Sequence, residues 1–307
     1  MIHEKTGARD LAPADLPRTT LPSAALPPAD AGAPLTYRAL NRDGACLRYF
    51  LRAGTDPRAW ALFIHGAGTD HRSFERQLAL FDSRYNILLP DLSGQGLSTL
   101  PPGSVPTFEG VLGDLICLCE RHGLRDAVVL AHSFGAAVAQ ELALRRPEMV
   151  SRLVLIGGYN HHRSVRRSVL SHHLRIAVTH LALRVMPWPV LSRWFARMSS
   201  ADPATIAYTD MCLRRTGWRA WESLGTTAFA GMHEVDGYPR PHPTLVLRGE
   251  HDNPAVFASI DAEMARTLPD CRVTLLPGAG HSCHEDAPDA ANQAIRDFLA
   301  ATEADPA

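Results

Sequence analysis

The chain has almost no lysine and almost no net charge. Only Lys5 is a lysine among the 31 Lys and Arg residues, and the formal net charge is −1 over 307 residues. A near-neutral chain has no overall field that would attract nucleic acid, so we expect no nucleic-acid partner. With this much Ala and Pro, we interpret the preference for arginine as genome composition.

Long hydrophobic runs and paired cysteine motifs are also missing. No run of about 18 apolar residues occurs, which argues against a membrane span. Residues 1–10 are charged and have no apolar stretch, so we expect no secretory signal. None of the six cysteines forms a C-x-x-C pair, and we expect reduced thiols in a cytoplasmic protein.

The pattern of apolar residues predicts an α/β domain. Residues 1–34 are rich in Pro, Ala and Asp without any period, which predicts a flexible leader. Short apolar runs then alternate with helical patterns, as in a mostly parallel sheet with helices on both faces. The eight predicted strands are 35–40, 45–51, 60–64, 86–90, 127–131, 153–156, 244–247 and 272–276, and the predicted helices are 72–81, 108–122, 136–146, 255–268 and 289–300.

Residues 159–241 interrupt this alternation, because they contain helical patterns and no convincing strand. We therefore predict a helical cap at 159–241, a core formed by 35–158 and 242–301, and a tail at 302–307. Between His161 and Ser200 the chain has seven arginines and no acidic residue. This basic stretch suits an anionic substrate or carrier, a membrane surface or partner, or simply a solvated helix face. The simplest interpretation is an apolar roof over the active site, formed by Leu181, Leu183, Val185, Met186, Trp188, Leu191, Trp194 and Phe195.

The stretch 128–136 combines a strand, a tight turn and a helix around Ser133. Its sequence is VVLAHSFGA, in which Ala131 replaces the first glycine of a G-x-S-x-G motif and Gly135 keeps the second. Such a turn lifts a serine hydroxyl out of the sheet and places the next amide at a helix N-terminus. The same residues also fit an ordinary helix N-cap serine. The motif alone does not choose between these two roles.

Polar residues follow several other predicted strands, and parallel strands gather such residues at one edge of the sheet. The segment His65-Gly66-Ala67-Gly68 follows one strand, Arg248-Gly249-Glu250-His251-Asp252 follows another, and Gly278-Ala279-Gly280-His281 follows the last. A serine, an acid and a histidine therefore leave three strands in that chain order.

Over residues 35–301 the chain resembles the α/β-hydrolase superfamily, specifically the serine branch with a helical cap. Four motifs carry the resemblance: the His-Gly loop, the segment DLSGQGLS at 91–98, the serine turn, and the Asp and His strand ends. It implies a nucleophile at Ser133, a base at His281 and an orienting acid at Asp252. It also implies an oxyanion hole formed by the amides of Ala67 and Phe134.

Other polar residues remain as alternatives or as structural groups. Glu250 is an alternative to Asp252, which could instead cap the 255–268 helix. His284 is an alternative to His281, although we expect it at the rim or surface. We expect His65 and Asp91 to bond loop backbone and His132 to be buried. Adjacent histidine pairs point in different directions on a helix, so we predict no metal site in the cap.

These residues predict a cofactor-free serine hydrolase that cleaves a carboxylic ester or related acyl bond through an acyl-Ser133 intermediate. The expected substrate is small, hydrophobic and acyl, and anionic if the basic stretch faces it. A thioesterase acting on acyl-CoA or a carrier protein, or a carbon–carbon bond hydrolase, would use the same residues. A ligand receptor with this fold and little turnover is the alternative from another class.

Overall fold

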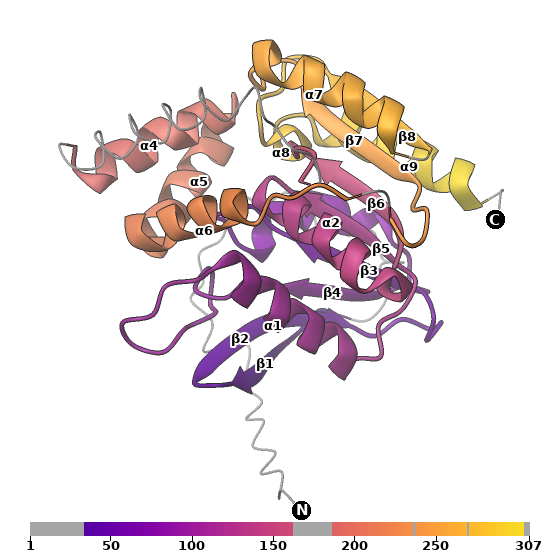
Figure 1. The fold of residues 1–307 in the computed structure, drawn as a ribbon, viewed down its shortest axis with the longest axis horizontal. Coiled ribbons are helices and arrows are strands. Elements are labelled where there is room, and N and C mark those ends of the chain that lie inside the picture. The colour runs from indigo at the N-terminus through magenta and orange to yellow at the C-terminus, as the bar shows by residue number, and fades with distance from the viewer. Residues whose placement is uncertain (1–33, 162–185, 236–237, 269, 304–307) are drawn as a thin grey trace, which may run out of the picture.

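An eight-stranded sheet forms the centre of the molecule (Figure 1). The computed structural model describes residues 34–161, 186–235, 238–268 and 270–303. The strands follow the order β1-β2-β4-β3-β5-β6-β7-β8, and only the β1–β2 and β2–β4 pairs are antiparallel. Their bounds are β1 Thr36–Arg42, β2 Ala45–Arg52, β3 Trp60–Ile64, β4 Asn86–Pro90, β5 Ala127–His132, β6 Val150–Ile156, β7 Thr244–Gly249 and β8 Cys271–Leu276. The predicted mostly parallel sheet is confirmed.

Helices bury both faces of this sheet, which explains why its central strands are apolar throughout. In β3, Leu62 and Ile64 face one hydrophobic cluster while Ala61 and Phe63 face the other. The first cluster includes side chains from α1 (Phe108–Arg121), α2 (Phe134–Arg145), α6 (Trp218–Ala230) and α7 (Pro254–Thr267). The second includes side chains from η2 (His71–Leu80), α8 (Cys283–Asp286) and α9 (Pro288–Glu303).

Several predicted elements differ from the structure, and β6 for example begins at Val150 instead of 153. The helix predicted at 72–81 is a 3₁₀ helix, η2, in which Phe74, Gln77 and Leu80 recur every third residue on the side that is buried or half-buried. The last helix, α9, continues to Glu303, beyond the predicted core limit at 301. Arg152 on β6 holds it there by donating to the hydroxyl of Thr302 at 2.7 Å and to its carbonyl at 3.0 Å.

Three helices occupy the described part of the predicted cap: α4 (Trp188–Ser199), α5 (Pro203–Thr216) and α6. They lie together beside the sheet in Figure 1, with α5 packed against both α4 and α6. The described residues between 159 and 241 contain no strand. Residues 1–33 of the predicted leader at 1–34 lie outside the described residues, as do most of the basic stretch and the roof residues Leu181, Leu183 and Val185.

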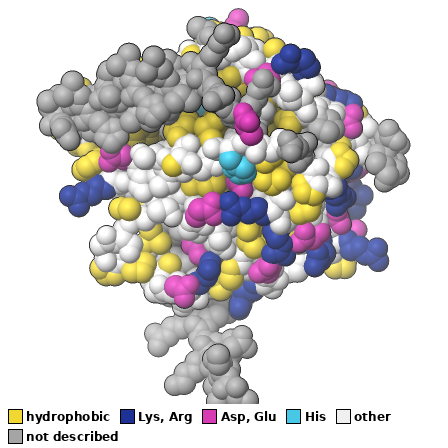
Figure 2. Space-filling model, in the orientation of Figure 1, with side chains coloured by type: hydrophobic (Ala, Val, Ile, Leu, Met, Phe, Trp, Pro, Cys, Tyr) yellow, Lys and Arg dark blue, Asp and Glu magenta, His cyan; other side chains and the backbone are white. Residues whose placement is uncertain are grey.

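The surface of the described residues has charges of both signs. Figure 2 shows basic and acidic side chains interspersed on one face of the molecule, consistent with the near-neutral sequence. Among the described residues, no helix is both long and apolar enough to cross a bilayer. All six cysteines are free, and burial raises the pKa of Cys119 and of Cys283 to about 12.

Candidate functional site

Ser133 sits on a strained turn between β5 and α2. Its backbone has φ 52° and ψ −114°, a combination that L-residues rarely adopt. A hydrogen bond of 2.8 Å from its amide to the Ile156 carbonyl ties the turn to β6. Ser133 occupies the N-cap position of α2, yet its side chain makes no capping hydrogen bond. The N-cap role therefore does not account for its hydroxyl.

Gly135 allows α2 to begin directly against β3. A Cβ atom added there would lie 2.2 Å from the Ile64 carbonyl oxygen. We expect Gly135→Ala to lower the free energy of unfolding by about 1–3 kcal/mol, because the turn must move to relieve this clash. Urea denaturation measures the change. Gly225→Ala in α6 is the matched control, since its added Cβ meets nothing within 4 Å. Equal losses in both variants would contradict this account of the turn.

The structure brings Ser133, His281 and Asp252 together from three strand ends. Nε2 of His281 lies 2.8 Å from Oγ of Ser133, and Nδ1 lies 3.0 and 3.1 Å from the two carboxylate oxygens of Asp252. Ser133 is half-buried, and Asp252 is only 6% exposed. These are the three side chains that the resemblance implied, in hydrogen-bond contact in the expected order.

The charge of Asp252 fixes which imidazole nitrogen has the proton. Burial alone would raise the pKa of the Asp252 carboxyl, but His281 and Arg248 lower it below its usual value. An ionised carboxylate can only accept hydrogen bonds, so Nδ1 of neutral His281 must be the donor. Nε2 is then a free acceptor directed at the Ser133 hydroxyl.

Hydrogen bonds of the His65 ring hold the loop after β3 in place. The ring of His65 bonds the Gly66 carbonyl through Nδ1 at 2.9 Å and accepts from the Leu92 amide through Nε2 at 2.9 Å. His65 thus bonds loop backbone, as the sequence predicted. Neither the Ala67 nor the Phe134 amide has an acceptor among the described residues, and Phe134 is the first residue of α2. Both amides can therefore donate to a ligand.

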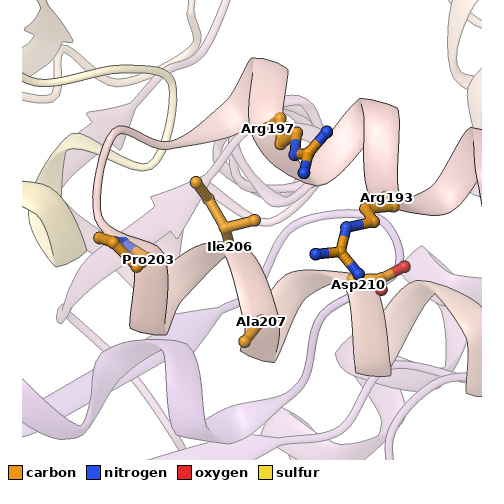
Figure 3. A pocket seen from close by; sticks show the side chains of 6 residues that line it. All are labelled: Arg193, Arg197, Pro203, Ile206, Ala207 and Asp210. Atoms are coloured by element: carbon orange, nitrogen blue, oxygen red, sulfur yellow. The ribbon is translucent and has the colours of Figure 1, made fainter.

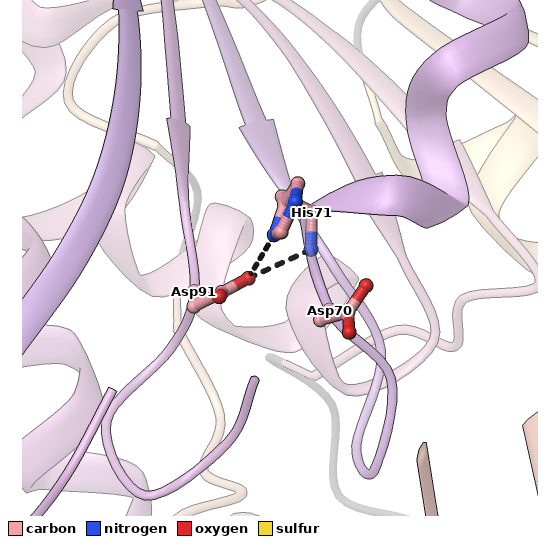
Figure 4. A group of neighbouring side chains, drawn as sticks. All are labelled: Asp70, His71 and Asp91. Carbon is pink, nitrogen blue, oxygen red and sulfur yellow. Dashed lines mark hydrogen bonds and ion pairs between the residues drawn. The ribbon is translucent and has the colours of Figure 1, made fainter. Parts of the chain in front are cut away.

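Asp70, His71 and Asp91 form an acidic group beside this loop (Figure 4). One oxygen of Asp91 accepts from the amide and Nδ1 of His71, at 2.8 and 2.7 Å, and the other accepts from the Leu97 amide at 2.7 Å. Protein N–H groups thus engage both oxygens of Asp91. The group braces two loops, in agreement with the structural role predicted for Asp91.

Asp70 connects the same loop to the cap. Its carboxylate accepts from Arg72 and from the Tyr208 hydroxyl, at 2.7 and 2.9 Å, and from Arg215. Although burial alone would raise the pKa of Asp70, hydrogen bonds from Arg72 lower it well below its usual value. Tyr208 and Arg215 lie on α5, so a buried carboxylate fastens a cap helix to the loop that contains Ala67.

The apolar roof differs from the predicted one. Trp194 and Met186 are 53% and 40% exposed, because they lie on the outer side of the cap. Leu213 and Trp221 lie closest to the loop instead: a Cβ built on Gly68 would be 2.4 Å from Leu213 and 3.2 Å from Trp221. Behind Trp221 stand two predicted roof residues, with ring centroids 5.8 Å and 4.5 Å away, namely Trp188 and Phe195. Leu213 lies on α5 and Trp221 on α6, so no spacing within a single helix pairs them in the sequence.

The remaining candidate residues lie elsewhere. Glu250 is exposed and accepts from the Gly278 amide at 2.8 Å, away from His281. Asp252 is not the cap of α7, whose N-cap residue is Asn253. The prediction for His284 is wrong, since it is fully buried with its ring 5.2 Å from Phe74 and 4.8 Å from His132. His132 is buried as predicted.

A pocket lies between α4 and α5 on the cap (Figure 3). Two exposed arginines, Arg193 and Arg197, line it together with Pro203, Ile206, Ala207 and Asp210. Asp210 is held by the Ser192 hydroxyl at 2.6 Å and by Arg214 at 3.0 Å. No residue of the Ser133–His281–Asp252 group lines this pocket, so any ligand there would contact the cap and not the reacting atoms.

Comparisons with known proteins cover most of the chain. A model described as "Alpha/beta hydrolase family" matches residues 61–294. The magnesium-chelatase 30 kDa subunit of Rhodobacter capsulatus is 29% identical over 264 residues, which cover 78% of this chain and 86% of that protein. The (E)-2-((N-methylformamido)methylene)succinate hydrolase of Acinetobacter baylyi is 23% identical over 261 residues, 83% and 94% of the two chains. The match to Protein ABHD8 of Bos taurus spans only 55% of that protein.

Solved structures give the same picture of the fold. The crystal structure of a hydrolase from Pseudomonas aeruginosa PA01 matches with a TM-score of 0.66 and 25% identity, covering 86% of this chain and 98% of that one. Named hydrolases therefore occur among both the relatives and the similar structures.

Proposed function

This chain belongs to the alpha/beta hydrolase family, whose model matches residues 61–294, and from that premise we propose that it is a serine hydrolase of carboxylic esters or related acyl bonds. The observation that carries the proposal is the chain of hydrogen bonds from Ser133 through His281 to Asp252. The family and the sheet confirm the fold class inferred from the four motifs. The relatives support a hydrolase in general, and the ester bond as the bond that it cleaves is our proposal.

In the first half of the reaction, His281 accepts the Ser133 proton at Nε2 while Oγ attacks the substrate carbonyl carbon. The carbonyl oxygen gains negative charge and accepts hydrogen bonds from the amides of Ala67 and Phe134. His281 then returns the proton to the leaving alcohol, and the carbon–oxygen bond breaks. Asp252 stabilises the imidazolium throughout and keeps Nδ1 protonated.

In the second half, water attacks the acyl-Ser133 carbonyl while His281 takes one of its protons. The same two amides stabilise the second oxyanion. Collapse of this intermediate releases the carboxylic acid and returns the proton to Ser133. Leu213, Trp221 and the aromatic side chains behind them support an apolar acyl group, because they line the loop next to Ala67.

Labelling with a fluorophosphonate tests the proposal directly. We expect an adduct on Ser133 in the wild type and none in His281→Ala, since the hydroxyl needs its base to react at neutral pH. Mass spectrometry of the digested protein identifies the modified residue. His284→Ala is the matched control, because it removes a buried histidine of the same region that does not touch Ser133. A folded wild type without an adduct would contradict the hydrolase proposal and favour a ligand receptor, to be sought by ligand-dependent stabilisation.

A thioesterase acting on acyl-CoA or acyl-carrier protein is a second candidate. The pocket lined by Arg193 and Arg197 favours it, because these exposed guanidinium groups could meet phosphate groups of a carrier while the acyl chain lies under the cap. Comparing kcat/KM for acyl-CoA with that for short p-nitrophenyl esters decides between the two. A preference for acyl-CoA that disappears in Arg193→Gln/Arg197→Gln would support the thioesterase, and equal losses for both substrates would not.

A further inference from the structure

A buried arginine lies behind the candidate triad. Arg248 is the fifth residue of β7 and only 2% exposed. Its Nη1 donates to Asp252 at 2.8 Å, on the same carboxylate that accepts from His281. Its Nε and Nη2 donate to Asp261 on α7 at 3.0 and 2.8 Å, and Nη2 also donates to the Gly158 carbonyl. One guanidinium therefore joins the acid of the triad to a second, buried carboxylate.

The rest of the Arg248 environment fixes this orientation. The guanidinium carbon lies 4.0 Å from the centre of the Phe257 ring, which covers one face of the group. A planar, fork-shaped cation bonded on two edges and stacked on a ring has little freedom to turn. Although burial alone would lower the pKa of Arg248, its hydrogen bonds to Asp261 and Asp252 raise it, so the cation persists at neutral pH.

We propose that Arg248 is a positioning residue that holds the Asp252 carboxylate toward His281, and that Asp261 balances its charge so that Asp252 stays effectively negative. Without Asp261, the arginine would neutralise the field that Asp252 exerts on the imidazole. Without Arg248, the buried carboxylates of Asp252 and Asp261 would both lose the cation that donates to them. The inference rests on the proposed function only where it concerns turnover, because the charge balance exists whether or not the protein is a hydrolase.

Few other charges of the described residues act on this group. Within that part of the chain, the titratable groups facing His281 and Asp252 are His132 from β5 and Cys283, His284 and Asp286 from α8. Burial lowers the pKa of His132 far below its usual value and that of His284 to about 3, so both are neutral near pH 7. Burial raises the pKa of Cys283 to about 12, so its thiol stays protonated. Asp286 is engaged by the Gly280 amide and by Ser200. Substitution of Arg248 or of Asp261 therefore isolates the effect of that charge on the His281 imidazole.

Titration of the His281 ring by NMR in the full chain tests the proposal without requiring turnover. The ring signal of His281 is assigned among 15 histidines as the one missing from His281→Gln. We expect Arg248→Met to move the titration midpoint of this signal to higher pH, because a cation near the imidazole is lost. We expect Asp261→Asn to move it to lower pH, because an anion is lost. Each shift should reach about half a pH unit or more.

Asp114→Asn is the matched control, since Asp114 is an α1 carboxylate paired with Arg42 at 2.9 Å and should leave the midpoint unchanged. Asp261→Asn keeps the shape of the side chain and remains informative if Arg248→Met does not fold. In turnover assays, Arg248→Met should lower kcat about 10- to 100-fold with little change in KM. Unchanged midpoints in both variants would overturn the proposal and leave Arg248 a purely structural group. If the wild type showed no labelling of Ser133 but Arg248→Met and Asp261→Asn shifted the His281 midpoint in opposite directions, only the proposed hydrolase function would be overturned.

Discussion

Replacing Ser133 by alanine is expected to lower kcat for an activated ester by about 10⁶-fold, because a serine acting with its base contributes that much in hydrolases with this triad. The residual rate should still exceed that in water, since the amides of Ala67 and Phe134 and the binding pocket remain. Steady-state turnover of a p-nitrophenyl ester measures the loss. Ser98→Ala is the matched control: its hydroxyl bonds the Asp91 carbonyl at 2.6 Å and the Arg48 amide at 2.8 Å, away from His281.

The same position makes a second, independent prediction about stability. Ser133 holds a φ of 52° that glycine adopts without a Cβ penalty, so Ser133→Gly should raise the free energy of unfolding by about 1 kcal/mol while it lowers turnover as Ser133→Ala does. Urea denaturation measures the free energy of unfolding of the wild type and of the two variants. An active Ser133→Ala enzyme would contradict the nucleophile. An unstabilised Ser133→Gly would contradict only the strain at the turn.

The sequence predicted the sheet from local apolar patterns, and it predicted the triad from one topological rule together with the resemblance to the α/β-hydrolase superfamily. Apolar runs of strand length gave the eight strands, and parallel strands place their carboxyl ends at one edge. Ser133 directly follows β5, and Asp252 and His281 lie in the loops that follow β7 and β8. Their convergence therefore needed no knowledge of how any helix packs.

Contacts between distant elements could not be predicted in the same way. Asp70 meets Tyr208 across 138 positions of sequence, and the spacing of α5 says only that Tyr208 lies on some buried face. We expect His284 at the rim or surface because His281 takes the position of the family base, yet the ring of His284 on α8 is buried 5.2 Å from that of Phe74 on η2. The predicted roof residues were partly wrong for a related reason. Amphipathic periodicity identifies the apolar face of a helix but not the element that this face packs against.

Arg248 and Asp261 did leave a signal in the sequence. A charged residue that continues the apolar run Thr244–Leu247 must be buried or mark the end of the strand. Asp261 lies one turn from Phe257 and three residues before Met264, on the same side of α7. A lone arginine in a strand and a lone carboxylate on an apolar helix face predict a buried ion pair, because neither charge is tolerated alone.

Replacing Asp252 by asparagine is expected to lower kcat on the order of 10⁴-fold, as loss of the orienting carboxylate does in such a triad. An asparagine amide group can donate to Nδ1, which would move the proton of His281 to Nε2 and leave no acceptor for the Ser133 hydroxyl. KM should change little, because Asp252 is buried behind the imidazole and away from the acyl group.

Glu250→Gln is the control for this substitution, since it removes a carboxylate two residues away that accepts only from the Gly278 amide among the described residues. We expect it to keep kcat within about twofold, because an exposed backbone contact contributes little to the chemistry. If Glu250→Gln lost activity and Asp252→Asn kept it, the acid of the triad would be assigned wrongly and the hydrogen bonds at 3.0 and 3.1 Å would have no catalytic meaning. The pair of variants therefore separates the geometry of the site from its chemistry, because both carboxylates follow the same strand and only one of them touches His281.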